Sequence, residues 1–277
     1  MRLTGTSCAV LLAVCIARAG AASEAATSLE HGYQLMYAFD FASAEQVFGQ
    51  WRAEHPGDPL APMSQATNLL FSELYRSGIL QAQLFVGDGA FTGAKPPVSA
   101  DLRARFDVVV ADAEAMAQAR LSEDAQDRDA LFVLATSFGL RADFAALVEG
   151  RHMAALSYTR QATRAARQLI GVAPDYADAY LSIGLGQFIV GSLAAPMRWV
   201  LRVAGFKGDK RQGMRNLQIT ADGGRFLGPF ARILLAIAYL REHDTKRARD
   251  LLVGLDRDFP SNPMFARELQ RLASKAN

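Results

Sequence analysis

The chain has 277 residues, of which 51% are hydrophobic and 21% charged, and its formal net charge is +2 at pH 7. This composition is typical of a globular protein and excludes a disordered chain, which would combine low hydrophobicity with a large net charge. The near balance of charge also argues against nucleic-acid binding, which normally requires a clear basic excess.

Residues 1–22 have the three parts of a secretory signal peptide. Arg2 is followed by an apolar run over 8–17 and by the small residues Ala19, Gly20 and Ala21 at the expected cleavage site. The run is shorter than the roughly 20 residues that a membrane span needs. A first helix of the fold, or a lipoprotein anchor around residues 12–15, would be the alternatives. We therefore expect an exported protein, periplasmic or secreted, with one domain over 23–277.

Cleavage of this segment would change the chemistry of the chain. Cys8 and Cys15 are its two cysteines, and Arg2 and Arg18 account for its excess positive charge. The remaining chain would be neutral and without thiols. Disulfides, thiolate nucleophiles and cysteine-ligated metals would then be excluded.

The remainder of the chain shows helical periodicity throughout. In 41–54, for example, apolar residues recur every three or four positions and Pro56-Gly57 follows. Short connections between such segments favour antiparallel helix pairs. The predicted helices, in chain order, are 41–54, 59–75, 102–119, 130–147, 153–170, 177–190, 209–221, 230–240, 245–258 and a final 263–276.

One spacing of small, large and proline residues recurs along the chain. A small residue is followed at intervals of 12, 4 and 8 residues by a small residue, a larger residue and a proline. The small residues would let two helices cross closely, and the proline would end the second helix. The three instances are Gly32-Ala44-Phe48-Pro56, Gly150-Ala162-Ala166-Pro174 and Ala236-Ala248-Leu252-Pro260.

This spacing resembles the tetratricopeptide repeat (TPR), a helix-turn-helix unit of about 34 residues. Tyr180-x-x-Ile183-Gly184 resembles the start of such a unit. The resemblance implies an all-α fold, a right-handed α-solenoid of about five antiparallel TPR-like helix pairs. Insertions at 77–99 and 192–208 would interrupt two pairs, and 263–276 would cap the last one.

The resemblance also implies a concave protein-binding groove lined by the first helix of each pair. The inner faces here are nearly all apolar, so an exposed groove would promote aggregation and we expect something to cover it. The two insertions could fill the groove as core, or form a lid over it. Our candidate interaction residues are Tyr33, Tyr37, Leu181, Leu185, Phe188, Trp199, Arg198, Arg202 and Arg211.

Charged residues are unevenly distributed. Residues 107–129 contain seven acidic residues and two arginines, whereas 198–215 contains six basic residues and Asp209. Opposite solvated faces would explain this, as would a docking surface or head-to-tail self-association. Arg198 and Arg202 beside Trp199 would also suit peripheral contact with a membrane.

The sequence shows no pattern of residues typical of an enzyme. The four histidines lack metal-ligand spacing, residues 205–210 lack the phosphate-loop pattern, and no G-x-S-x-G is present. We expect no catalytic residue, cofactor or metal. The predicted function is a non-catalytic protein-interaction scaffold or assembly factor of the cell envelope. The alternative is binding of an apolar small molecule or lipid in a cavity covered by 77–99 and 192–208.

Overall fold

A computed structural model of the chain describes residues 29–79, 99–192, 195–196, 199, 202, 205 and 208–276. The predicted signal peptide, Arg198 and most of the two predicted insertions lie outside these residues. The described part contains helices and no strands. The first helix occupies residues 29–37. It is followed by α2 (Phe41–Glu54), α3 (Leu60–Arg76), α5 (Ala100–Glu123), α6 (Arg128–Asp143), a π-helical turn (Phe144–Val148), α7 (His152–Val172), a 3-10 turn (Ala177–Ala179), α8 (Tyr180–Ser192), α10 (Lys210–Gly223), α11 (Gly228–Arg241), α12 (Thr245–Asp258) and α13 (Pro263–Ala276).

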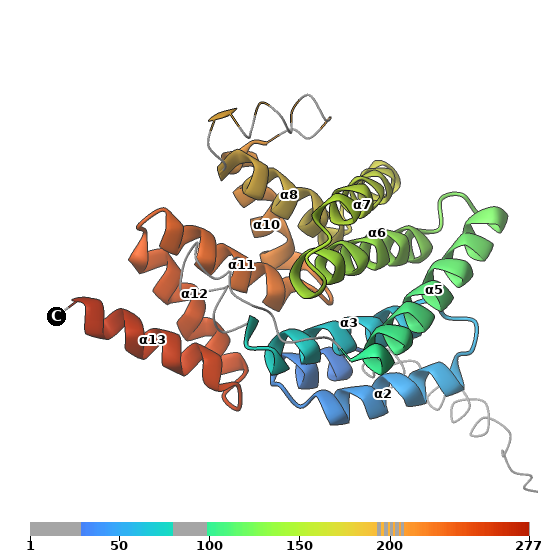
Figure 1. The fold of residues 1–277 in the computed structure, drawn as a ribbon, viewed down its shortest axis with the longest axis horizontal. Coiled ribbons are helices and arrows are strands. Elements are labelled where there is room, and N and C mark those ends of the chain that lie inside the picture. The colour runs from blue at the N-terminus through green and yellow to red at the C-terminus, as the bar shows by residue number, and fades with distance from the viewer. Residues whose placement is uncertain are drawn as a thin grey trace, which may run out of the picture.

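The helices pack as consecutive pairs (Figure 1). In the described part, residues 29–37 and α2, α3 and α5, α6 and α7, α8 and α10, and α11 and α12 make five pairs, with α13 packed on α12. Most other helix contacts join one pair to the next along the chain. The expected all-α, solenoid-like arrangement is therefore confirmed, while its right-handedness stays a prediction.

Small residues allow the close helix crossings that the repeated spacing predicts. A Cβ on Gly32 would lie 2.3 Å from a ring carbon of Phe48, so only glycine fits under that ring. Ala44 and Phe48 are fully buried in the same pair. Between α8 and α10, a Cβ on Gly213 would lie 2.6 Å from the backbone nitrogen of Phe188. In the first pair, the ring of Phe48 lies directly against Gly32. In the pair of α8 and α10, the backbone at Phe188 lies directly against Gly213.

Gly150, the first member of the instance Gly150-Ala162-Ala166-Pro174, does not have this role. It lies in the turn before α7 with φ of +72°, and a Cβ there would meet nothing within 4 Å. The helices α6 and α7 instead meet through Ala135, Ala165 and Ala166. The assignment of Gly150 to the repeat was wrong, because glycine is required there by backbone conformation and not by a helix crossing.

The first helix packs against the C-terminal half of the chain. The Tyr37 hydroxyl donates a hydrogen bond to the carbonyl oxygen of Phe226 at 3.1 Å, and the Asn262 amide donates to the carbonyl oxygen of Tyr37 at 2.8 Å. The rings of Tyr33 and Phe226 are 4.9 Å apart between centroids. Tyr33 and Tyr37 are each only 2% exposed. The expectation that these tyrosines form an accessible surface is therefore corrected.

Residues 224–227 form a turn (the 224–227 turn) that contacts both the first helix and α6. The Asp178 carboxylate accepts hydrogen bonds from the backbone nitrogens of Arg225 and Leu227, each at 2.8 Å. Burial raises the pKa of Asp178, and these backbone N–H groups partly offset the rise. Asp178 thus satisfies the buried backbone donors of the turn. Phe226 lies between the first helix and α6, where it also stacks on Phe132 at 5.9 Å.

One helical stretch of the described chain, Arg128–Val148, is long and apolar enough to cross a membrane. It comprises α6 and the following π-helical turn. Leu131, Phe132 and Val133 are buried within the protein, and the helix packs against α3, α5 and α7. Its hydropathy is accounted for by its position in the core.

Candidate functional site

The helix α7 has one buried face and one basic face. Small and apolar residues at helical spacing, including Ala162, Ala166 and Leu169, pack into the protein. Arg160, Arg164 and Arg167 are exposed on the other side, at the three- and four-residue spacing that places side chains on one face. The helix has no acidic residue. It therefore presents a row of positive charge that no acid on the same helix offsets.

This row borders a groove between α7 and α8. The groove has a volume of about 530 Å³ and is lined by the three arginines, by α8 residues that include Gln187 and Val190, and by Gly205. Among the described residues that line it, none is acidic. We name it the α7/α8 groove. Gly205 belongs to the predicted second insertion, and it is the described residue of that segment that lines the groove.

Most arginines elsewhere in the described chain lie beside a carboxylate. Arg141 contacts Glu114 at 2.7 Å, and Arg120 contacts Asp127 at 2.7 Å. In the described part of the chain, no ion pair or hydrogen bond occupies the guanidinium of Arg164 or Arg167. Other exposed arginines, such as Arg105, Arg211 and Arg249, also have no ion pair in the described part of the chain. Arg164 and Arg167 differ from them in lining a groove without an acidic residue among its described lining.

Several carboxylates of the acidic stretch 107–129, unlike the arginines of the groove, form ion pairs with other helices. Arg52 from α2 contacts Asp112 at 2.6 Å, and Arg141 from α6 contacts both Asp107 and Glu114. These ion pairs partly neutralise the stretch, although the Asp107 and Asp112 side chains stay 52% and 41% exposed. The free negative charge of the stretch is therefore smaller than its sequence suggests, and head-to-tail self-association stays a prediction.

The predicted interaction residues do not form one surface. Leu181 and Phe188 are buried, Leu185 is half-buried, and Tyr33 and Tyr37 lie in the core. Trp199 is 67% exposed, and Arg202 and Arg211 are also exposed. Arg198 lies outside the described residues. The three α8 side chains point to a cavity, whereas Trp199, Arg202 and Arg211 stay candidates for a partner surface.

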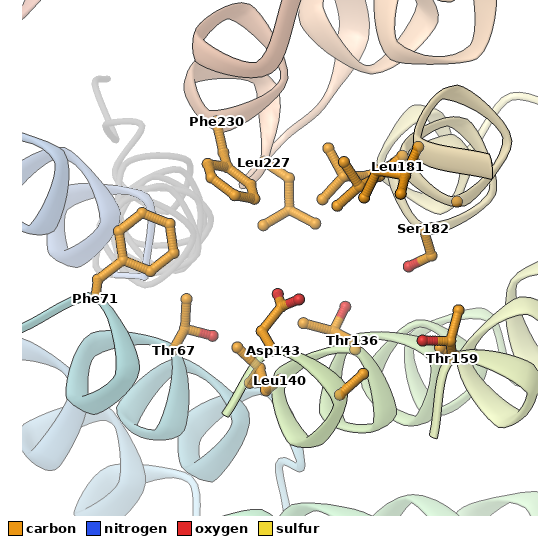
Figure 2. Close-up of a pocket in the computed structure, with 16 residues that line it drawn as sticks. Thr67, Phe71, Thr136, Leu140, Asp143, Thr159, Leu181, Ser182, Leu227 and Phe230 are labelled. Carbon is orange, nitrogen blue, oxygen red and sulfur yellow. The ribbon is translucent and has the colours of Figure 1, made fainter. Parts of the chain in front are cut away.

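The cavity lies between α3, α6, α7, α8 and α11. Two connected lobes, of about 140 and 300 Å³, share Phe71, Asp143, Leu185 and Phe230 among their lining residues. Figure 2 shows the Asp143 carboxylate pointing into the space between these helices, with Thr136 nearby. Burial raises the pKa of Asp143 to about 7. The cavity is otherwise lined mainly by apolar side chains.

Sequence reasoning missed Asp143, Arg164 and Arg167. The basic face of α7 was readable, because 152–172 contains three spaced arginines and no acid, but the stretch 198–215 has the higher charge density. Asp143 carries no local signal, since it follows Arg141 at the end of a helix like many surface acids. Only tertiary packing places it in a cavity.

Within the described residues, no group of three or more histidine, cysteine, aspartate or glutamate side chains could hold a metal ion.

Comparison with known proteins shows a likeness at the level of structure. The sequence matches no protein-family model and no curated protein. Among solved structures, it is similar to a thermophilic TPR protein from Thermus thermophilus, with a TM-score of 0.46 and 16% sequence identity, over 89% of this chain and 97% of that one.

Proposed function

We propose that this chain is a non-catalytic protein-interaction scaffold of the cell envelope, and that its α7/α8 groove holds an acidic segment of a partner protein. The observation that carries the proposal is the row of exposed arginines along the groove, in which Arg164 and Arg167 have no counter-charge in the described part of the chain. The envelope location rests on the signal-like residues 1–22.

The chemistry of the groove favours an acidic polypeptide. Guanidinium groups bind carboxylates through paired hydrogen bonds, and Arg164 and Arg167 lie close to one turn apart on α7. The α8 side supplies the Gln187 amide, which could bind a peptide backbone, and the apolar Val190. Exposed Trp199, Arg202 and Arg211 would extend the surface beyond the groove. A partner with clustered Asp or Glu residues would match this surface in charge.

Binding of a labelled oligoglutamate peptide tests the proposal. We expect the full chain to bind it by fluorescence anisotropy, and the double variant Arg164→Glu/Arg167→Glu to lose about tenfold or more in affinity, because both attractive charges become repulsive. The matched control is Arg105→Glu/Arg249→Glu, which reverses two other exposed arginines, on α5 and α12. The control variant should lose much less affinity, since neither of its arginines lines the groove.

The partner can be sought with the same variants. A photo-crosslinker placed at position 164 should give a discrete adduct in an envelope fraction, and one at position 249 should not. Equal loss of peptide binding in both double variants would show that net charge alone matters, and would contradict a specific groove. An oligolysine peptide bound as tightly as oligoglutamate would contradict the proposal outright.

A further inference from the structure

The apolar cavity between α3, α6, α7, α8 and α11 is a second site with its own chemistry. Its larger lobe has a volume of about 300 Å³. An apolar cavity of about 150 Å³ is enough to bind benzene. The lobe is therefore large enough for a ligand of about a dozen non-hydrogen atoms. Aromatic and aliphatic side chains such as Phe71, Leu185 and Phe230 would contact its hydrocarbon part.

Among the described residues that line the cavity, Asp143 carries the acidic side chain. It points into the cavity (Figure 2), and no hydrogen bond or ion pair connects it to another described residue. The side chain is half-buried, so a carboxylate without a protein partner is available to a ligand in the cavity. Among the described residues that line the two lobes, the other ionisable side chain is Arg241 on α11, which is mostly exposed to solvent.

Two of the four hydroxyl side chains in the described lining of the cavity can act on a ligand only as acceptors. Thr159 donates its hydroxyl hydrogen to the carbonyl oxygen of Ala155 at 2.8 Å, and Thr67 donates to that of Met63 at 2.9 Å. Both hydroxyls therefore face the cavity only as acceptors. A ligand group that carries several donors and a positive charge would satisfy them together with the carboxylate. A protonated amine has three donors and no acceptor.

We propose that this cavity binds a small apolar amine, with its ammonium group against Asp143 and its hydrocarbon body against Phe71, Leu185 and Phe230. A carboxylate ligand is disfavoured because it would bring a second negative charge to the same group. The proposal is independent of the α7/α8 groove, since Arg164 and Arg167 do not line the cavity.

Calorimetric titration with three matched compounds tests it. The full chain at pH 8 is titrated with 4-phenylbutylamine, 4-phenylbutanol and 4-phenylbutanoate, which share one hydrocarbon body and differ in the head group. We expect the amine to bind at least about tenfold more tightly than the alcohol, as a charge-assisted hydrogen bond in an apolar site predicts. The carboxylate should bind most weakly.

Variants assign the preference to one residue. Asp143→Asn keeps the shape of the side chain and removes its charge, so it should remove the amine preference and leave alcohol binding within about threefold of the original. Asp250→Asn makes the same change at an exposed position of α12, and it should leave both the amine preference and alcohol binding unchanged. Far-ultraviolet circular dichroism establishes that both variants are folded.

Three results would overturn the proposal. The original chain could bind none of the three compounds, the alcohol or the carboxylate could bind as tightly as the amine, or Asp143→Asn could retain the amine preference. None of these results bears on oligoglutamate binding at the α7/α8 groove, so the two proposals fail separately.

Discussion

The 224–227 turn and the α7/α8 groove differ in how completely their polar groups are paired. In the turn, the backbone N–H groups of residues 225–227 reach the carboxylate of Asp178, and Phe226 is 1% exposed. In the groove, three arginines line an open space without an acidic residue among the described lining. Complete pairing marks a region that stabilises the fold, whereas unpaired groups such as Arg164 and Arg167 on a rigid helix mark a region available to a ligand.

The largest expected effect is at the turn. Phe226→Ala should lower the free energy of unfolding by about 3–5 kcal/mol, because it leaves a cavity between the rings of Tyr33 and Phe132. Urea denaturation followed by circular dichroism measures the change. Trp199→Ala, at a side chain that is 67% exposed, is the matched control and should change stability by less than about 0.5 kcal/mol. Equal effects of the two substitutions would contradict the central role of the turn.

An intermediate, pH-dependent effect is expected at Asp143. Burial raises its pKa to about 7 in the folded protein, whereas an unfolded aspartate has a pKa of about 3.9. Between these values the folded state binds more protons, so this residue makes the stability fall as pH rises from about 4 to about 7, with the full penalty present above pH 7. Asp143→Asn should therefore be more stable by about 1–3 kcal/mol at pH 8.

The same variant supplies its own internal control. At pH 4 the aspartate is protonated in the folded state and partly protonated in the unfolded state, so Asp143→Asn and the original chain should differ by less than about 0.5 kcal/mol. Thermal melts of both proteins at pH 4, 6 and 8 measure this dependence. A difference that is constant across this range would show that packing, and not the charge of Asp143, causes it.

The smallest effect on stability is expected at the groove. Arg164→Ala/Arg167→Ala removes two exposed side chains without a counter-charge in the described part of the chain, so the free energy of unfolding should change by less than about 0.5 kcal/mol. Arg141→Ala is the comparison, because it leaves Glu114, which is 16% exposed, without its partner. If the groove pair proved as destabilising as Arg141→Ala, the arginines would be structural and the contrast between the two regions would fail.

Local sequence patterns were sufficient for most of the helices, but the helix at 29–37 is missing from those predicted. The bounds of α2, α12 and α13 agree with the periodicity over 41–54, 245–258 and 263–276. Apolar spacing is a local signal, as are Pro56 and Pro260 after the first two of these helices and Pro263 at the start of the third. The pairing of Gly32 with Phe48 was also readable, since it recurs at the spacing of a known repeat.

Contacts between distant residues could not be read in this way. Asp178 and Leu227 are 49 positions apart, and no motif connects them. The acidic stretch illustrates the same limit: its arginine partners come from other helices, so local charge counting overestimated its free charge. The arginines of α7 were visible as a pattern, but the lack of partners at Arg164 and Arg167 is a property of the folded chain.

The hydrogen bonds of Tyr37 have a consequence for the order of folding. Its hydroxyl binds the carbonyl oxygen of Phe226, and its own carbonyl binds Asn262, which is 225 positions further along the chain. Loop closure over such a distance opposes early formation of these contacts. During synthesis, the first helix and its pair partner α2 emerge before residues 226 and 262, which the first helix also contacts. The first helix would reach its final packing only when nearly the whole chain is available.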